Sequence, residues 1–565
     1  MVSRIFRFFK KESSRITEAA FLIGTFALIS QFLGLVRDRS LAHVLGPSAT
    51  LDIYYAGFRI PDIIFNSIST LVSITVLIPF FIDKIEHKAK GSESAQALLN
   101  QIFSVFLTGI AIIALAAFIL MPFLSHYVAP GFSPEERTNL ISMSRIMLLS
   151  PIFLGLSNLF STITQMYKRF IIYAFAPIAY NLGIIAGIYF FLPSMGIMGL
   201  GLGVALGAFC HMLLQLPVLA SHGFYPRLTR KIDWKEMRKI FLLSLPRTLG
   251  LALSSITISI IIAIATTLDT GAVSIFNFSF NLQAVPITII GLSYSVAAFP
   301  SLSIAYAEGK FDVFKKQIVS VARQIIFWSL PVMVLFIVLR AQIVRVILGS
   351  GRFTWSDTRL TAAALALFTI SVVAQSLIGL LVRGYYAAGK TRRPLTVNLV
   401  FTALEVFLAL GLLYVFRHYD VFRYFIEGLL RVPDVHGTEM LMLPLGYSFG
   451  TILNYYALWL LFKKDFFKAG EGKPLRRTLF QSFHAAVLMG AMTYAMLSVT
   501  GQFFNVDTTV EVFAQGVFAG LVGIITGGVI LSLLKSDEHG VVLAALRRKI
   551  WKTETIVSDG TEMTQ

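Results

Sequence analysis

The sequence predicts an all-α polytopic membrane protein with about 14 transmembrane helices, in two pseudo-symmetric six-helix lobes followed by two C-terminal helices. Of its 565 residues, 56% are hydrophobic and only 14% are charged, whereas a soluble protein carries about 25% charged residues. Apolar segments of about 20 residues, long enough to cross a ~30 Å hydrocarbon core, recur along the chain. They lack the period-two alternation of membrane strands, which excludes a β-barrel as the predicted class.

The apolar segments give the predicted helices in order. They cover 18–43, 56–83, 97–126, 139–167, 171–193, 195–220, 238–267, 272–306, 315–348, 358–388, 392–416, 440–462, 478–500 and 511–535. Residues 1–17 are basic and amphipathic, and no small-residue cleavage site follows, so we expect a cytoplasmic lead-in instead of a removed signal peptide. Residues 536–565 are polar and predict a helix end with a disordered cytoplasmic tail.

The basic residues that give the chain its net charge of +18 are spread unevenly over the predicted loops. Most of the 48 Lys and Arg residues fall in alternate loops, all on one side if the N-terminus is cytoplasmic. This asymmetry orients membrane helices, so it predicts both termini in the cytoplasm and makes nucleic acid an unexpected partner. The single cysteine, Cys210, cannot form an internal disulfide, and no spacing of Cys and His indicates a metal site.

A weak internal repeat divides the chain. "LGL" at 33–35 returns at 249–251, "PIAYNL" at 177–182 returns as "PLTVNL" at 394–399, and Pro79 has a counterpart in Pro300. The matches keep their order at offsets of 216, 217 and 221 residues. We therefore expect an N-lobe at 18–220, a basic cytoplasmic linker at 221–237 and a C-lobe at 238–462 with an external insert at 417–439. Two helices at 478–535 follow. Parallel repeats of this kind are typical of secondary transporters.

Several motifs resemble those of one family. "SQFLGLVRDRSLAHVLGPSATLDIYYAGFRIPD" at 30–62 is similar to the N-terminal signature of the MurJ/MviN family of lipid II flippases, which are related to MATE exporters. Further landmarks follow in order: "APGF" at 129–132, "KRFIIYAFAP" with Asn181, "QLP" at 215–217, "GRFT" at 351–354 and "YYAAGKTRRP" at 385–394. The resemblance covers about residues 20–462.

The resemblance implies a flippase of the bacterial cytoplasmic membrane that acts by alternating access. A cationic cavity between helices 1, 2, 7 and 8 would take the diphosphate headgroup of lipid II, and helices 13 and 14 would form part of a groove for the lipid tail. The physics is consistent, because an unpaired diphosphate cannot cross hydrocarbon and guanidinium groups bind phosphate oxygens in pairs.

Carried over by position, the resemblance assigns substrate-binding roles to one set of residues: Ser30, Gln31, Arg37, Asp38, Asp52 and Arg59. The chain also departs from the family pattern. Gln31, Phe65 and Asn281 stand where the family has cavity arginines, and Thr70 and Leu71 replace a glutamate and a glycine. Arg247, two residues before the second "LGL", is the candidate for a compensating cation, and Asn281 stays in the predicted site.

Glu405 is a lone carboxylate in a predicted span, which makes it a candidate for Na⁺ or H⁺ coupling. The family's sodium site would be altered here, because its helix-7 position falls near the apolar Ile261.

Each of these residues also has a structural interpretation. Arg37 and Asp38 can form a local ion pair at a helix end, Arg59 can pair with Asp52 or Asp62, and Asp52 can cap its own helix from outside, which is the role we favour for it. Arg247 can anchor a helix end, and Glu405 can form a static bridge to Arg383 or Arg247.

The sequence leaves three functions open. The first is a lipid II flippase that has no cofactor and is driven by an ion gradient or the membrane potential. The second is an exporter of another polyprenyl-linked sugar or an amphiphilic drug. The third is a non-transporting scaffold for cell-wall synthesis proteins. No nucleotide-binding or catalytic motif indicates an enzyme.

Overall fold

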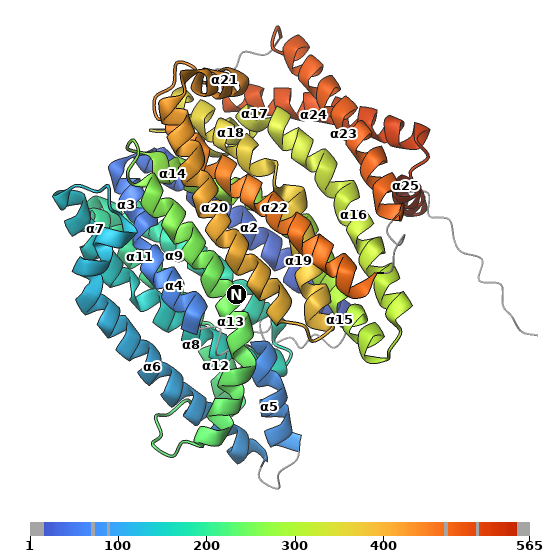
Figure 1. The fold of residues 1–565 in the computed structure, drawn as a ribbon. Coiled ribbons are helices and arrows are strands. Elements are labelled where there is room, and N and C mark those ends of the chain that lie inside the picture. The colour runs from blue at the N-terminus through green and yellow to red at the C-terminus, as the bar shows by residue number, and fades with distance from the viewer. Residues whose placement is uncertain (1–15, 69–73, 87–90, 468–472, 504–507, 551–565) are drawn as a thin grey trace, which may run out of the picture.

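The computed structural model describes residues 16–68, 74–86, 91–467, 473–503 and 508–550 (Figure 1). Within these ranges the chain is helical and contains no strand, which confirms the predicted fold class. Thr70 and Leu71, where a glutamate and a glycine were expected from the resemblance, lie outside the described residues.

The N-terminal half combines two long helices, α2 and α6, with shorter ones that are interrupted by breaks. Its elements are α2 (Ile16–Leu45), α3 (Ala49–Gly57), α4 (Arg59–Ile68), α5 (Ile74–Glu86), α6 (Gly91–Val128), α7 (Pro134–Met147), α8 (Leu149–Met166), α9 (Phe170–Ala186), the π-helix η2 (Gly187–Phe191), α10 (Leu192–Met195), α11 (Ile197–Leu213) and α12 (Leu216–Ser221).

The C-terminal half also combines long helices with interrupted ones. Its elements are α13 (Trp234–Ala265), α14 (Ala272–Pro286), the π-helix η3 (Ile287–Leu292), α15 (Ser293–Ala307), α16 (Phe311–Val338), α17 (Arg340–Leu348), α18 (Trp355–Thr369), α19 (Val372–Ala387), α20 (Arg392–His418), α21 (Asp420–Leu430), the 3₁₀-helix η4 (Thr438–Leu441) and α22 (Met442–Phe466). Helix α23 (Lys473–Thr500) packs on α16, α24 (Thr509–Leu533) packs on α23 and α17, and α25 (Asp537–Ile550) ends the described chain (Figure 1).

The predicted number of spans is not confirmed. Nine helical stretches of the described chain are long and apolar enough to cross a membrane, or ten if the pair α18 and α19, bent by 42°, counts as one. Helices α2, α13 and α22 also fill predicted spans and are not among these stretches. In α2, Arg37, Asp38 and Arg39 follow the apolar part of the helix. A helix surrounded by other helices can keep such groups because protein partners replace water.

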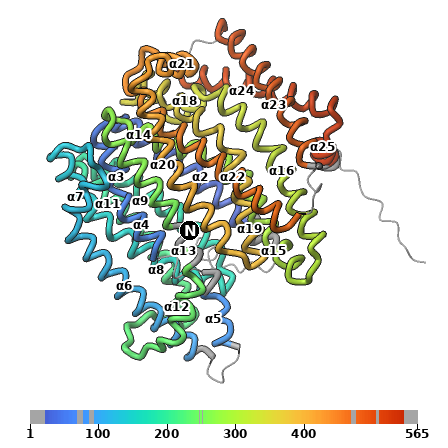
Figure 2. Tube along the Cα trace, viewed as in Figure 1, coloured from blue at the N-terminus to red at the C-terminus, as the bar shows by residue number. Residues whose placement is uncertain are grey.

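Two ends of the helical bundle can be distinguished. The chain trace places α3, α7 and α21 at one end and α5 and α12 at the other (Figure 2). The first end carries the loops that the charge pattern predicts to be external, and we call it the outer end.

The largest apolar core joins the two halves. It contains Leu41 and Tyr54 of the N-terminal half together with Phe276, Phe278 and Phe353 of the C-terminal half. A second core lies around Leu77 and Phe160 of the N-terminal half and includes Met237 and Ile240 of α13, and a third lies around Phe314 and Phe462 of the C-terminal half. The lobe boundaries drawn from the sequence remain predictions.

The internal repeat extends to the loops at the outer end. Ser133 caps α7 in a capping box with Glu136, and Thr354 caps α18 in a capping box with Asp357. Both pairs are separated by 221 residues, which is the offset between Pro79 and Pro300. Each box satisfies two backbone N–H groups at a helix start, so the two loops end in the same local structure.

Candidate functional site at the boundary between the halves

Arg37 and Asp38 form an ion pair in the outer part of α2. The Arg37 Nε and Nη2 atoms donate to Asp38 Oδ1 at 2.9 and 2.8 Å. The Asp38 residue is only 3% exposed. The local ion pair expected as the structural interpretation is therefore present, and it partly neutralises the cation nearest the boundary.

Asn281 completes the coordination of Asp38 from the other half. Its Nδ2 atom, on α14, donates to Asp38 Oδ2 at 2.9 Å. Both carboxylate oxygens thus accept hydrogen bonds, one from each half of the chain. The resemblance expects an arginine at this position, and the amide supplies a donor there without adding positive charge.

Ser30 joins the same cluster through Asn181. Arg37 Nη1 donates to Asn181 Oδ1 at 3.2 Å, and Asn181 Nδ2 lies 3.5 Å from both the backbone oxygen and the Oγ of Ser30. Gln31 is half-buried beside them, and within the described chain it takes no part in these hydrogen bonds.

Asp52 makes a second polar contact between the halves. Its Oδ2 accepts from the Gly271 N–H at 2.7 Å, and its Oδ1 accepts from the Ser274 N–H at 2.8 Å and the Ser274 Oγ at 2.5 Å. The favoured prediction that Asp52 caps its own helix is wrong, because Ser48 caps α3. Asp52 instead caps the N-terminus of α14, where helical N–H groups lack partners and favour a carboxylate.

Arg59 lies one turn beyond Tyr55 on the inner side of this contact. Its Nε donates to the Tyr55 carbonyl at 3.1 Å, and its Nη2 is 3.7 Å from Asp62 Oδ2. The predicted structural pairing with Asp62 is thus present, and that with Asp52 is not. The buried Tyr55 hydroxyl has no hydrogen-bond partner within the described chain and lies within electrostatic range of Arg37, Asp38 and Arg59.

The two halves also touch through their backbones at the outer end, along what we call the outer seam: Gly46, Gly131, Thr266, Gly351 and His43. A Cβ on Gly131 would clash with the Thr266 carbonyl, and one on Gly351 would clash with the His43 carbonyl. The Arg352 N–H donates to the His43 carbonyl at 3.0 Å. The seam is closed in this structure, and the landmarks "APGF" and "GRFT" both lie on it.

Contacts between the halves at the inner side are made by side chains. Asn66 Nδ2 of α4 donates to Ser255 Oγ of α13 at 2.7 Å, and Lys84 of α5 forms a 2.9 Å ion pair with Glu236 of α13. Such contacts can exchange with water more readily than packed backbones, because their side chains can rotate away.

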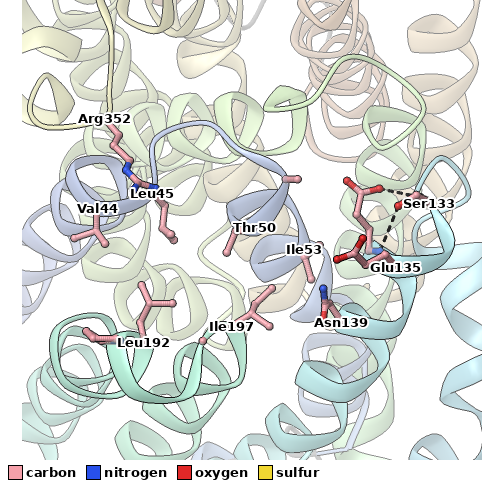
Figure 3. A pocket seen from close by; sticks show the side chains of 14 residues that line it. Val44, Leu45, Thr50, Ile53, Ser133, Glu135, Asn139, Leu192, Ile197 and Arg352 are labelled. Atoms are coloured by element: carbon pink, nitrogen blue, oxygen red, sulfur yellow. Dashed lines mark hydrogen bonds between the residues drawn. The ribbon is translucent and has the colours of Figure 1, made fainter.

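An open pocket of about 770 Å³ lies next to the outer seam (Figure 3). Its wall is apolar at Ile53, Leu192 and Ile197, and Glu135 and Arg352 lie on opposite sides of it. Arg352 is the member of this lining that comes from the C-terminal half, so the pocket exists in this form only while the seam is closed.

Glu405 lies apart from these contacts, inside the C-terminal half. It is buried between α20 and α22, where its Oε1 accepts from Thr451 Oγ1 at 3.1 Å. A Cβ on Gly450 would clash with the Glu405 side chain, and one on Gly446 would clash with the Ala409 backbone, so α20 and α22 pack closely from Glu405 to Ala409. Arg247 lies in α13, but its side chain is outside the described residues.

Sequence reasoning missed several members of this boundary. Asn181 was noted only as a landmark, and Tyr55, Gly271 and Ser274 were not singled out. The signal for Gly271 and Ser274 was the short "TGAVS" turn at the start of a predicted span. No signal in a single sequence reveals that a carboxylate of one half caps a helix of the other.

These features define a class: a polytopic membrane protein with a two-lobed transporter fold and a polar boundary between its halves. A solved structure of lipid II flippase MurJ in an inward closed conformation shares the fold with a TM-score of 0.69 at 18% identity, covering 94% of this chain and 100% of that one. An inward-facing MATE family multidrug resistance transporter of the MOP superfamily reaches 0.61 at 16% identity, covering 79% of this chain and 98% of that one.

The sequence model of the family described as lipid II flippase MurJ matches residues 41–514. The chain belongs to this family. A relative from Buchnera aphidicola subsp. Schizaphis graminum, named probable lipid II flippase MurJ, is 26% identical over 414 residues, covering 71% of this chain and 79% of the relative.

Proposed function

We propose that this protein moves lipid II, the undecaprenyl-diphosphate precursor of peptidoglycan, across the cytoplasmic membrane by alternating access. Family membership supports the substrate. The observation that carries the mechanism is Asp38, a buried carboxylate that binds Arg37 of its own half and Asn281 of the other. When the halves separate, Asp38 loses its hydrogen bond from Asn281. The space that opens beside Arg37 then allows its guanidinium group to bind a phosphate of the substrate.

The cationic character of the site is lower than the resemblance implies. Asn281 is neutral, Phe65 is apolar, and Arg37 and Arg59 both lie beside carboxylates. This observation favours a second candidate, an exporter of another amphiphile on the same fold. The two differ in chemistry, because only a diphosphate substrate needs the Arg37 guanidinium.

A paired substitution separates the two candidates. Arg37→Gln with Asp38→Asn keeps a hydrogen-bonded neutral pair, so no buried charge is left without its partner. Arg230→Ala, at an exposed linker position, is the matched control. Each variant is tested for rescue of a bacterium depleted of its own MurJ and for binding of the purified protein to lipid II.

For a flippase we expect the control to rescue and the pair to fail, with lipid II affinity reduced about tenfold or more, since ~1.4 kcal/mol corresponds to a factor of ten. Binding and rescue by the pair at the level of the unmodified chain would exclude Arg37 as the phosphate partner. A correctly inserted unmodified chain that neither binds lipid II nor rescues would contradict the substrate itself.

We also propose that Glu405 couples transport to Na⁺ or H⁺. A buried carboxylate with a hydroxyl partner can have its negative charge neutralised by binding either cation. Glu405→Gln keeps the size and the Thr451 contact, so we expect insertion to be normal and transport in vesicles to lose its dependence on an imposed ion gradient. If transport by Glu405→Gln depends on the ion gradient as strongly as transport by the unmodified chain, Glu405 is not the coupling residue.

Both termini are proposed to face the cytoplasm. Cell-wall synthesis proteins are the class of partner that a lipid II supplier would meet.

A further inference from the structure

The external insert at 417–439 contains a helix with two different faces. Helix α21 begins at Asp420, two residues after α20 ends at His418. One face packs on the protein through Phe422, Ile426 and Leu430. The opposite face carries Val421, Tyr424, Phe425 and Leu429, which are 85, 66, 61 and 62% exposed.

Polar contacts hold the insert to the C-terminal half. Glu427 is buried and accepts from Thr438 Oγ1 at 2.6 Å and from Arg423 Nε at 3.1 Å. Arg340 of α17 donates to the Leu430 carbonyl at 3.3 Å. Arg359 of α18 donates to both carboxylate oxygens of Asp434.

The C-terminal end of α21 is therefore bound to α17 and α18, and its N-terminal end follows α20 directly. The apolar face of α21 cannot turn inward without breaking these bonds.

The exposed face of α21 follows, in the chain, an exposed apolar stripe on a helix apolar enough to span the membrane. Helix α20 is one of the apolar spans, and Phe407, Leu410 and Tyr414 form an exposed stripe along its outer half. These residues follow the three- and four-residue spacing of one helix face. The stripe is followed on α21 by Val421, Tyr424 and Phe425, with only the short turn at Tyr419 between the helices.

Water is an unfavourable surrounding for this face. Burying a large apolar side chain is worth about 1.5–3 kcal/mol, and the four side chains lie together on one side of one helix. Tyrosine and other aromatic side chains are enriched where hydrocarbon meets the headgroups. An amphipathic helix at the end of a span lies in this layer with its apolar face among the acyl chains.

We infer that α21 is an interfacial helix whose face of Val421, Tyr424, Phe425 and Leu429 binds the acyl chains of the membrane leaflet at the outer end. The occupant of this face is lipid and not a second copy of the chain. The inference rests on α20 being a membrane span and does not depend on the proposed substrate.

Spin labels at single cysteines test this inference. In a Cys210→Ala chain in vesicles of phosphatidylethanolamine and phosphatidylglycerol, labels are placed at Val421 and Phe425. Phe407 on α20 is the control in lipid, and Ser356 at the exposed start of α18 is the control in water at the same end. Because these side chains are exposed, labelling leaves the packing intact. Frequent collision of a label with oxygen indicates that the label lies in hydrocarbon. Frequent collision with a water-soluble nickel chelate indicates that it lies in water.

We expect the labels at 421 and 425 to match Phe407 in oxygen collisions and to collide with nickel several-fold less than Ser356. Nickel collisions equal to those at Ser356 would place the face in water and overturn the inference. Dipolar broadening between labels of two copies, lost on dilution with unlabelled protein, would also overturn it in favour of self-association.

Discussion

At the scale of single residues, Asp38 and Asp52 explain why the halves are joined where they are. Both carboxylates belong to the N-terminal half, both are buried, and both accept hydrogen bonds from α14 of the other half. Leaving a buried acceptor without its hydrogen-bond donor costs about 1–3 kcal/mol, and more when the acceptor is charged. Separation of the halves must therefore bring water or substrate to these carboxylates at the same time.

Gly131 offers a sharp test of the outer seam. Gly131→Ala places a methyl group against the Thr266 carbonyl, whereas Gly109→Ala meets no atom within 4 Å and is the control. We expect Gly131→Ala to hold the seam apart and abolish rescue of MurJ-depleted cells. Gly109→Ala should be neutral or stabilise α6 by up to about 1 kcal/mol.

The readout is labelling by a membrane-impermeant maleimide at Ala42→Cys in a Cys210→Ala background, at a buried position next to His43 of the seam. Equal labelling rates in the two alanine variants would show that Gly131 does not control closure.

At the scale of elements, the two capped loops act as equivalent parts. The loop before α7 places Gly131 on the end of α13, and the loop before α18 places Gly351 on the end of α2. Each half thus covers the outer end of the other half's first helix. Because the capping boxes fix both loops, we expect the seam to open and close as one unit instead of fraying at one loop.

The start of α25 provides a pH-dependent element. Glu538 accepts from Arg323 Nε of α16 at 2.6 Å, from Thr478 Oγ1 of α23 at 2.9 Å and from Ser536 Oγ at 3.0 Å. Burial of Glu538 opposes its charged form, but these hydrogen bonds outweigh burial and lower the pKa of the carboxyl below its ordinary value. A lowered pKa stabilises the fold above the unfolded-state pKa, about 4.3, and this stabilisation is lost as the pH falls below it.

We therefore expect the unmodified chain to have a higher Tm than Glu538→Gln at pH 7, and the difference to shrink as the pH is lowered below about 4. Thermal unfolding in detergent measures it, with Glu308→Gln as an exposed control. A difference in Tm that does not change with pH would mean that the Glu538 charge does not stabilise α25.

At the scale of the whole molecule, the sequence predicted the helical class and the family because both depend on long stretches of residues. Length and apolarity did not settle the number of spans. They also could not show what the charged side chains of α2 contact, because the partners of Arg37 and Asp38 lie 144 and 243 residues away. The roles of Asp52 and Asn281 depend on contacts between the halves, which no local pattern encodes. The Arg37–Asp38 pair was predictable because its members are neighbours in the chain.

The predicted orientation of the molecule can be tested in intact cells. In a Cys210→Ala background, an impermeant maleimide should label Ser356→Cys at the outer end and leave Arg230→Cys in the basic linker unlabelled until the cells are opened. Both positions are exposed, so accessibility of the side chain does not bias the comparison. Labelling of Arg230→Cys in closed cells would invert the topology.

The outer seam has a consequence for how relatives of this chain can be compared. Carbonyl groups are present at every position, so contacts made by Thr266 and His43 through their backbones require no matching side chain in the opposite half. Co-variation between the halves should then be weakest where they approach most closely. What such a contact requires of the sequence is a glycine, because a Cβ at Gly131 or Gly351 would clash with the opposite backbone. A glycine-to-alanine scan would therefore detect these contacts, whereas paired substitutions in the two halves would not.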